Sequence, residues 1–182
     1  MIDPQIAELM RPYLLPGERL TWTGGPPAGL RVTAKDILLI PFSLLWGGFA
    51  LVWEGLVLSS GAPFFFPLFG VPFVLVGLYL IVGRFVFDAW VRGRTVYALS
   101  GRRALVLRRI PMGGLSSAPL DGQVRLVGQR NGGGTLEFGA PNPLRAFGGF
   151  NFLPALQAVA FERVADVMAV YALAVDGKGA AG

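Results

Sequence analysis

Arginine is the residue type best placed to do chemistry in this sequence. Seven arginines fall within one stretch of the chain, and Asp88 is the only acidic residue among them. They are Arg84, Arg92, Arg94, Arg102, Arg103, Arg108 and Arg109. A guanidinium keeps its charge and presents a planar fork of donors that suits phosphate or carboxylate groups. Two readings stay open: the arginines contact anionic lipid headgroups, or they only set membrane topology and solvate a strand face. We expect Arg102 and Arg103 to project freely from a hairpin turn.

No basic and aromatic pattern of a known nucleic-acid module is present, so no nucleic-acid partner is predicted.

Carboxylates are few and scattered. Asp88, Glu137 and Glu162 form no D-x-D or E-x-x-E pair, so nothing indicates a carboxylate metal site or an acid–base pair. Glu54 differs because it lies inside an apolar stretch, where a carboxylate is a functional hint. Its position near the end of that stretch favours a structural role in which the side chain reaches the membrane interface. A close grouping of Asp88, Glu137 and Glu162 would instead favour an enzyme or transporter component.

The sequence contains no cysteine and no histidine. Thiol chemistry, disulfides, Fe–S clusters and thiolate zinc sites are therefore excluded. A Ser–His–Asp triad and a histidine-ligated haem are excluded as well. We predict no catalytic residue, no cofactor and no metal ligand.

Two long apolar stretches dominate the composition. The chain has 182 residues, of which 53% are hydrophobic and 15% charged, against about 25% charged in ordinary soluble domains. Residues 37–58 and 64–83 are each long enough to cross a hydrocarbon core of about 30 Å. A chain of this size cannot bury so much apolar sequence in one soluble core. The pattern predicts a transmembrane helical hairpin over residues 36–83, with a short turn near Gly61.

Basic residues flank only one side of this hairpin. Arg31 and Lys35 precede the first stretch, Arg84 and Arg92 follow the second, and the turn is uncharged. The positive-inside rule then places both termini in the cytoplasm, so the protein is expected to be a multi-pass membrane protein.

Small residues recur along the predicted hairpin. Ser43 and Gly47 are four apart, and Gly70 and Gly77 are seven apart, so each pair shares a helix face. Small side chains let membrane helices approach closely, and these four residues are expected to pack the hairpin. Trp46 and Trp53 are also seven apart and form one stripe, which faces either lipid or a partner helix.

The remaining sequence reads as one α+β domain divided by the hairpin. Residues 1–35 are expected to hold a cytoplasmic N-terminal helix and a first strand, and residues 84–176 a cytoplasmic domain with a flexible tail at 177–182. Alternating or β-rich patterns predict strands at 17–24, 95–99, 103–107, 123–129, 135–138 and 156–164, before a helix at 167–175. Leu20 and Trp22 are expected to join the sheet of Tyr97 and Leu105, because the first strand has no other core to join.

Several runs of this chain resemble bacterial membrane-bound pleckstrin-homology-like (PH-like) proteins. They are GERLTWTGGP, PFSLLWGGFALVWE, GLYLIVGRF, YALSGRRALVL, GTLEFG and FERVADVMAVY. The likeness covers most of the chain, and YALSGRRALVL directly after a membrane hairpin is its most specific part. At the turn, these proteins usually have Thr and Asp or Asn, where this chain has Ser100-Gly101. Before the last helix they usually have Ile-Pro, where this chain has Val164-Ala165. The resemblance implies a small antiparallel β-sandwich or barrel, closed by a C-terminal helix and anchored at the cytoplasmic face of the bacterial inner membrane.

The resulting expectation is a non-catalytic, membrane-anchored scaffold, adaptor or accessory subunit. Its partners would be membrane lipids and either a different protein or a second copy of this chain. The alternative is a small membrane enzyme or transporter component that uses Glu54 and the cytoplasmic carboxylates.

Overall fold

The computed structural model describes the chain except for residues 30–35, 112, 131–132, 140–158 and 181–182. The protein is α+β, as predicted, with helices and antiparallel sheets. It divides into two compact units, one made of residues 1–28 with 91–182 and the other of residues 29–90. Arg31, Lys35 and the first residues of the predicted 156–164 strand lie outside the described residues.

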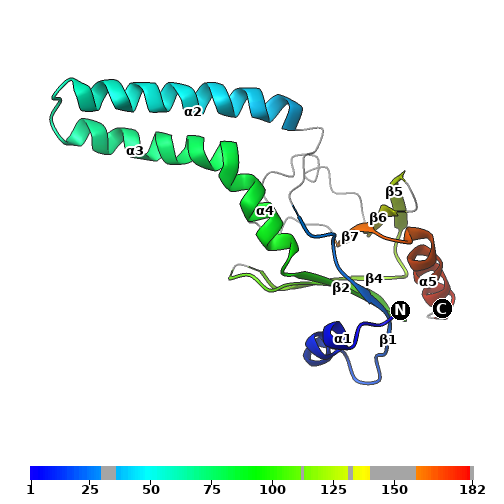
Figure 1. Ribbon diagram of the computed structural model, residues 1–182. Helices are drawn as coiled ribbons and strands as arrows, with labels where there is room; N and C mark the ends of the chain where they lie inside the picture. The colour runs from blue at the N-terminus through cyan, green and yellow to red at the C-terminus, as the bar shows by residue number, and fades with distance from the viewer. Residues whose placement is uncertain (30–35, 112, 131–132, 140–158, 181–182) are drawn as a thin grey trace. The chain divides into compact units, whose positions relative to one another are not determined.

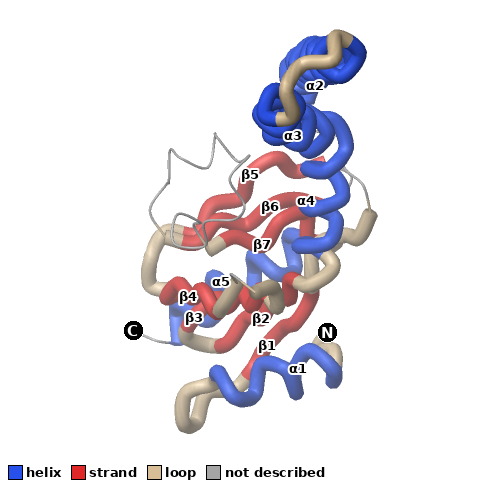
Figure 2. Tube along the Cα trace, turned by 90° about the vertical axis from the view of Figure 1, so that its left-hand side faces the viewer, coloured by secondary structure: helices blue, strands red, loops and turns tan. Residues whose placement is uncertain are grey.

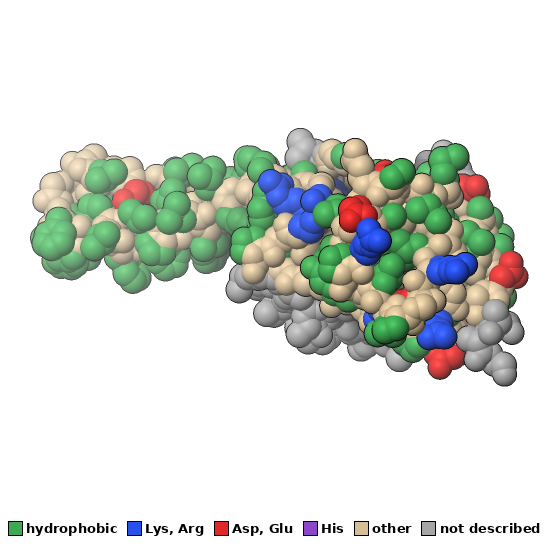
Figure 3. Space-filling view, turned by 90° about the horizontal axis from the view of Figure 1, so that it is seen from below, with side chains coloured by type: hydrophobic (Ala, Val, Ile, Leu, Met, Phe, Trp, Pro, Cys, Tyr) green, Lys and Arg blue, Asp and Glu red, His purple; other side chains and the backbone are tan. Residues whose placement is uncertain are grey.

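Residues 29–90 form a helical hairpin. Helix α2 (Asp36–Ser59) and helix α3 (Phe65–Leu78) run antiparallel around a short turn (Figure 1). Helix α3 continues through a π-helical segment, η2 (Tyr79–Gly83), into α4 (Arg84–Arg92). The helices at 36–59 and 65–92 are long and apolar enough to cross a membrane. Hydrophobic side chains cover most of the hairpin surface that Figure 3 shows.

The second helix extends beyond the predicted end at residue 83. Residues 84–92 contain no glycine or proline, and the next helix-breaking residue is Gly93. The apolar stretch therefore ends before the helix does.

The other unit contains a four-stranded sheet to which segments on both sides of the hairpin contribute. Its order is β1 (Leu20–Gly24), β2 (Thr95–Ser100), β3 (Arg103–Arg108) and β4 (Leu115–Pro119). Strand β1 precedes the hairpin, yet it pairs antiparallel with β2, with Trp22 opposite Leu99. The expectation that Leu20 and Trp22 join the sheet of Tyr97 and Leu105 is confirmed.

A second, three-stranded sheet and the C-terminal helix complete this unit (Figure 2). The sheet has the order β5 (Val124–Arg130), β6 (Gly133–Phe138) and β7 (Ala160–Val164). Helix α5 (Val167–Ala180) continues past residue 177, where the sequence predicted a flexible tail. A Cβ at Gly177 would lie 3.1 Å from Leu120 Cδ1, so this glycine lets the last turns pack closely.

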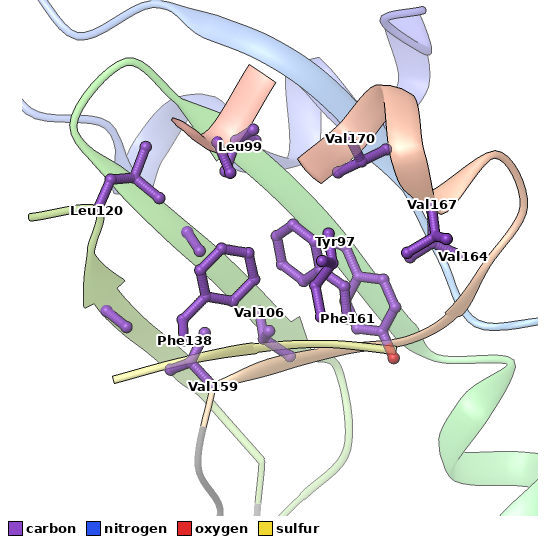
Figure 4. Close-up of a cluster of buried hydrophobic side chains, with 14 residues drawn as sticks. Tyr97, Leu99, Val106, Leu120, Phe138, Val159, Phe161, Val164, Val167 and Val170 are labelled. Atoms are coloured by element: carbon purple, nitrogen blue, oxygen red, sulfur yellow. The ribbon is translucent and has the colours of Figure 1, made fainter. Parts of the chain in front are cut away.

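The main core lies between the two sheets and α5 (Figure 4). Phe161 on β7 is fully buried at its centre. Its ring centroid lies 5.5 Å from that of Trp22, 5.0 Å from that of Tyr97 and 4.8 Å from that of Phe138. The strand that precedes the hairpin therefore shares its core with the last strand of the chain.

A second apolar cluster covers the other face of the four-stranded sheet. Helix α1 (Pro4–Met10) places the fully buried Met10 against Val96 and Leu105, and a short 3-10 turn, η1 (Arg11–Tyr13), follows. The carboxylate of Asp3 accepts a hydrogen bond of 2.8 Å from the Gln5 amide and so caps the helix. Strand β2 is buried along its whole length because both of its faces are covered.

Candidate functional site

The β2–β3 ladder separates the arginines into two groups. Thr95 lies opposite Arg108, and the Arg109 amide donates a 2.9 Å hydrogen bond to the Arg94 carbonyl. The β2–β3 ladder has one end that comes directly after α4 in sequence. That end therefore carries Arg94, Arg108 and Arg109. We call these three the proximal arginines. Arg94 and Arg109 are exposed and Arg108 is half-buried.

Arg102 and Arg103 lie at the opposite end of the same ladder. Arg103 and Arg108 are five residues apart on β3, which corresponds to about 17 Å along the strand. Arg102 is exposed. The seven arginines are consequently not one continuous patch.

Arg103 does not project freely, which corrects the expectation for this turn. Its Nε and Nη2 donate hydrogen bonds of 2.9 and 2.8 Å to the two carboxylate oxygens of Glu18. Nη2 also donates to the Tyr13 carbonyl at 2.8 Å. The side chains of Arg103 and Glu18 are only 18% and 1% exposed. This bidentate pair fastens the segment before β1 to the β2–β3 turn.

Glu18 has further partners that favour its charged form. Its Oε1 accepts a 2.7 Å hydrogen bond from the Ser100 hydroxyl, and its Oε2 accepts a 2.8 Å bond from the Leu15 amide. The hydrogen bond from Arg103 is the largest influence, and together with the other donors it lowers the pKa of Glu18 from 4.5 to about 2 despite burial. The pKa of Arg103 is raised by the same pair.

Two further arginines are also engaged or buried. Arg84, at the start of α4, forms a 2.8 Å ion pair with Asp36, the first residue of α2. The guanidinium carbon of Arg84 lies 4.4 Å from the centroid of the Phe85 ring. Arg92 is only 8% exposed. Of the predicted lipid contacts, Arg94, Arg102 and Arg109 are exposed, whereas Arg84, Arg103 and Arg108 are half-buried.

The four small residues predicted to pack the hairpin are all buried between α2 and α3. They are Ser43, Gly47, Gly70 and Gly77. A Cβ on Gly77 would lie 2.8 Å from the Gly47 Cα, so the two helices approach backbone to backbone at this point. The Ser43 hydroxyl donates to the Ile40 carbonyl at 2.9 Å, which satisfies it within its own helix.

The carboxylate of Glu54 on α2 packs against α3. A Cβ on Gly70 would collide with the Glu54 carboxylate and with the Trp53 ring, so the carboxylate lies directly over that glycine. Glu54 Oε2 is buried and has no hydrogen-bond partner among the described residues. The expectation that this side chain reaches the membrane interface stays a prediction.

Two acidic residues found here were not singled out from the sequence. Asp36 and Arg84 flank the two apolar stretches on the same side, and that symmetric placement could have indicated their pairing. Glu18 offered no comparable signal, because its contact with Arg103 depends on β1 pairing across the hairpin. In the described part of the chain, no group of three or more acidic side chains could hold a metal ion.

Comparisons with family models, curated proteins and solved structures found no match to this chain.

Proposed function

We propose that this protein is a membrane-anchored, non-catalytic adaptor whose PH-like domain is held at the cytoplasmic face of the bilayer. The pairing of β1 with β2 carries the proposal. These strands precede and follow the hairpin in sequence, so the domain folds only when both ends of the hairpin emerge on the same side of the membrane. Antiparallel α2 and α3 meet that requirement.

The architecture of the unit formed by residues 1–28 and 91–182 supports a PH-like assignment. Antiparallel sheets of four and three strands enclose one core, and a C-terminal helix packs against it. The resemblance in sequence implied a β-sandwich or barrel closed by such a helix. The architecture alone does not identify a ligand, so the function rests on surfaces and not on the fold.

The proposed topology predicts which parts of the chain are accessible from each side of the membrane. A reporter that is active only outside the cytoplasm should work when inserted after Gly61, in the uncharged turn. The same reporter should be inactive after Gly182. The reverse pattern of activity would contradict the topology, because arginine and lysine flank the hairpin on the side of the termini.

The proximal arginines are proposed to contact anionic lipid. Arg94 follows the end of α4 by two residues, and Arg108 and Arg109 lie beside it through the β2–β3 pairing. The nine-residue helix α4 connects them to the apolar stretch, and we propose that they reach the headgroups, where each arginine gains about 1 kcal/mol from the negative leaflet. The surface potential decays over about 8 Å at physiological salt, so groups held further away gain less.

Replacing the proximal arginines should remove lipid sensitivity without preventing insertion. The full chain is placed in vesicles of phosphatidylglycerol with phosphatidylcholine, or of phosphatidylcholine alone. Hydrogen exchange over residues 95–110 should be slower in the anionic vesicles, and this protection should weaken as salt rises. R94Q/R108Q/R109Q should lose the difference, whereas the control R102Q should keep it. If the wild type exchanges equally in both lipids, the proposed contact between the proximal arginines and anionic lipid is contradicted.

A further inference from the structure

Helix α4 has its charged side covered and an apolar side exposed. Arg84, Asp88 and Arg92 are spaced by four and share one side of the helix. The side chain of Arg84 is 15% exposed, Arg92 is 8% exposed and Asp88 is half-buried. Val86 and Trp90 lie about 200° around the helix from this stripe, because each follows one of its members by two residues. They are exposed at 56% and 36%. A helix surrounded by water has the opposite arrangement, with its charged side outward.

The exposed side of α4 continues a row that begins in the apolar stretch. Leu78, at the end of α3, and Val82, in η2, are both exposed. Val86 and Trp90 follow them at the same interval of four residues. We call Val86 and Trp90 the apolar edge of α4. The surface that the hairpin presents to lipid in the proposed membrane arrangement therefore extends onto α4 without interruption.

The ion pair between Arg84 and Asp36 indicates where the hydrocarbon core ends. These two residues flank the apolar stretches, and Arg84 Nη1 lies 2.8 Å from Asp36 Oδ1, so both stretches end at one level. Charged side chains are costly at the bilayer centre, which places this level at the boundary of the core. The headgroup layer beyond the core is about 5–7 Å thick on each side. Val86 follows Arg84 by two residues, about 3 Å along the helix, and so lies at the depth of that layer.

A bend keeps the rest of α4 close to the same layer. Helix α4 turns away from the axis of α3 at the π-helical segment η2 (Figure 1), and π-turns are a common cause of sharp bends. Trp90 follows Arg84 by six residues, about 9 Å along the helix. For a hairpin that crosses the membrane upright, the bend brings Trp90 nearer to the core than that length. Tryptophan is enriched at this depth, because its ring is apolar and its N–H is polar.

We infer that the apolar edge of α4 packs against lipid at the boundary between acyl chains and headgroups. Helix α4 is then an interfacial helix and not a linker in water. This inference rests on the proposed membrane anchoring and deepens the proposed lipid contact, because Arg94 follows α4 by two residues. The apolar edge holds the start of the domain at the surface where the proximal arginines meet anionic headgroups. Contact through the edge is apolar, so it does not depend on lipid charge or on salt, whereas contact through the arginines depends on both.

Spin labels on single cysteines measure the depth of the apolar edge, because the natural chain contains no cysteine. Val86→Cys and Trp90→Cys carry the labels on the edge. Leu51→Cys, on an exposed position of α2, is the control for the hydrocarbon core, and Val127→Cys, on β5, is the control for water. The full chain is placed in phosphatidylcholine vesicles. Each label is then tested for collisions with oxygen, which concentrates in lipid, and with a water-soluble nickel complex.

The ratio of oxygen to nickel collisions should be at least tenfold higher at residue 86 than at residue 127, and at least threefold higher at residue 90. Added phosphatidylglycerol or salt should leave these ratios unchanged. Ratios at residues 86 and 90 equal to that at residue 127 would overturn the inference. Rare collisions with both reagents would overturn it as well, because they would mean that protein and not lipid covers the edge. A water-like ratio at residue 51 would instead contradict the proposed anchoring itself.

A second measurement uses the natural chain, so that a label cannot draw α4 towards lipid. Phosphatidylcholine with a photoreactive diazirine near the glycerol end of one acyl chain is incorporated into the vesicles. After illumination, lipid should be attached to residues 84–92 at least tenfold more often than to residues 124–128 of β5. Equal attachment to both segments would refute the interfacial position of α4.

Discussion

Phe161→Ala should lower the stability of the divided domain by about 4 kcal/mol. The side chain is fully buried, and its removal deletes ring contacts with Trp22, Tyr97 and Phe138 and leaves a cavity between the two sheets. Pulse proteolysis of the full chain in detergent, across a urea series, measures the loss. Val127→Ala is a suitable control, because Val127 is 41% exposed and should change stability by less than about 0.5 kcal/mol.

The same residue allows a test of contact across the hairpin. Trp22 precedes the hairpin, and Trp22→Ala alone should destabilise the domain by about 3 kcal/mol. Because the two rings are in contact, the double variant should lose less than the sum of the single losses, by about 0.5–1.5 kcal/mol. Strictly additive losses would mean that the N-terminal strand and β7 do not share a core.

Replacing Glu18 should destabilise the domain about as much as replacing Trp22. Glu18→Gln removes the charge that pairs with Arg103 and leaves a guanidinium of low exposure without its anionic partner. A loss of about 3 kcal/mol is expected. Glu8→Gln is the matched control, because the Glu8–Arg11 pair is 3.5 Å long and both side chains are more than 70% exposed. That control should change stability by less than about 0.5 kcal/mol.

The pH dependence of stability should identify the same carboxylate. Glu18 has a pKa of about 2 in the folded protein against 4.5 ordinarily, so its charged form stabilises the fold above about pH 4.5. That stabilisation, about 3 kcal/mol, should be lost as the pH falls from about 4.5 towards 2. Urea midpoints at pH 7, 5, 4 and 3 measure this loss. The wild type and Glu18→Gln should converge on acidification, and a difference that stays constant with pH would contradict the role of the charge.

Sequence patterns predicted the elements whose signal is local. The apolar stretches predicted α2 and α3 to within a few residues. Alternation predicted β1, and β-forming residues on either side of a turn predicted β2 and β3. Strand β4 was not predicted, because its LSSAP sequence combines two serines with a proline and has little β propensity. Its place at the edge of the sheet explains why the proline is tolerated there.

The candidate site was less predictable than the fold. Clustering in sequence suggested one arginine surface, but strand pairing places Arg102 and Arg103 at the opposite end of the ladder from the proximal arginines. The Glu18–Arg103 pair joins residues 85 positions apart, and no local pattern reports such a contact. The contact of Glu54 was not predicted for a related reason, since its direction depends on the space above Gly70 in the neighbouring helix.

Removing residues 1–28 tests most directly whether the two ends of the chain build one domain. The truncated chain keeps the hairpin and the basic residues that flank it, so membrane insertion should be unchanged. Without β1, strand β2 loses its neighbour in the sheet, and Met10 and Trp22 no longer cover the two faces. Hydrogen exchange over residues 95–100, measured in vesicles, should rise from the protected level of the full chain to that of an open strand. A peptide of residues 1–28 added in excess should restore protection. Equal protection with and without residues 1–28 would contradict the divided domain.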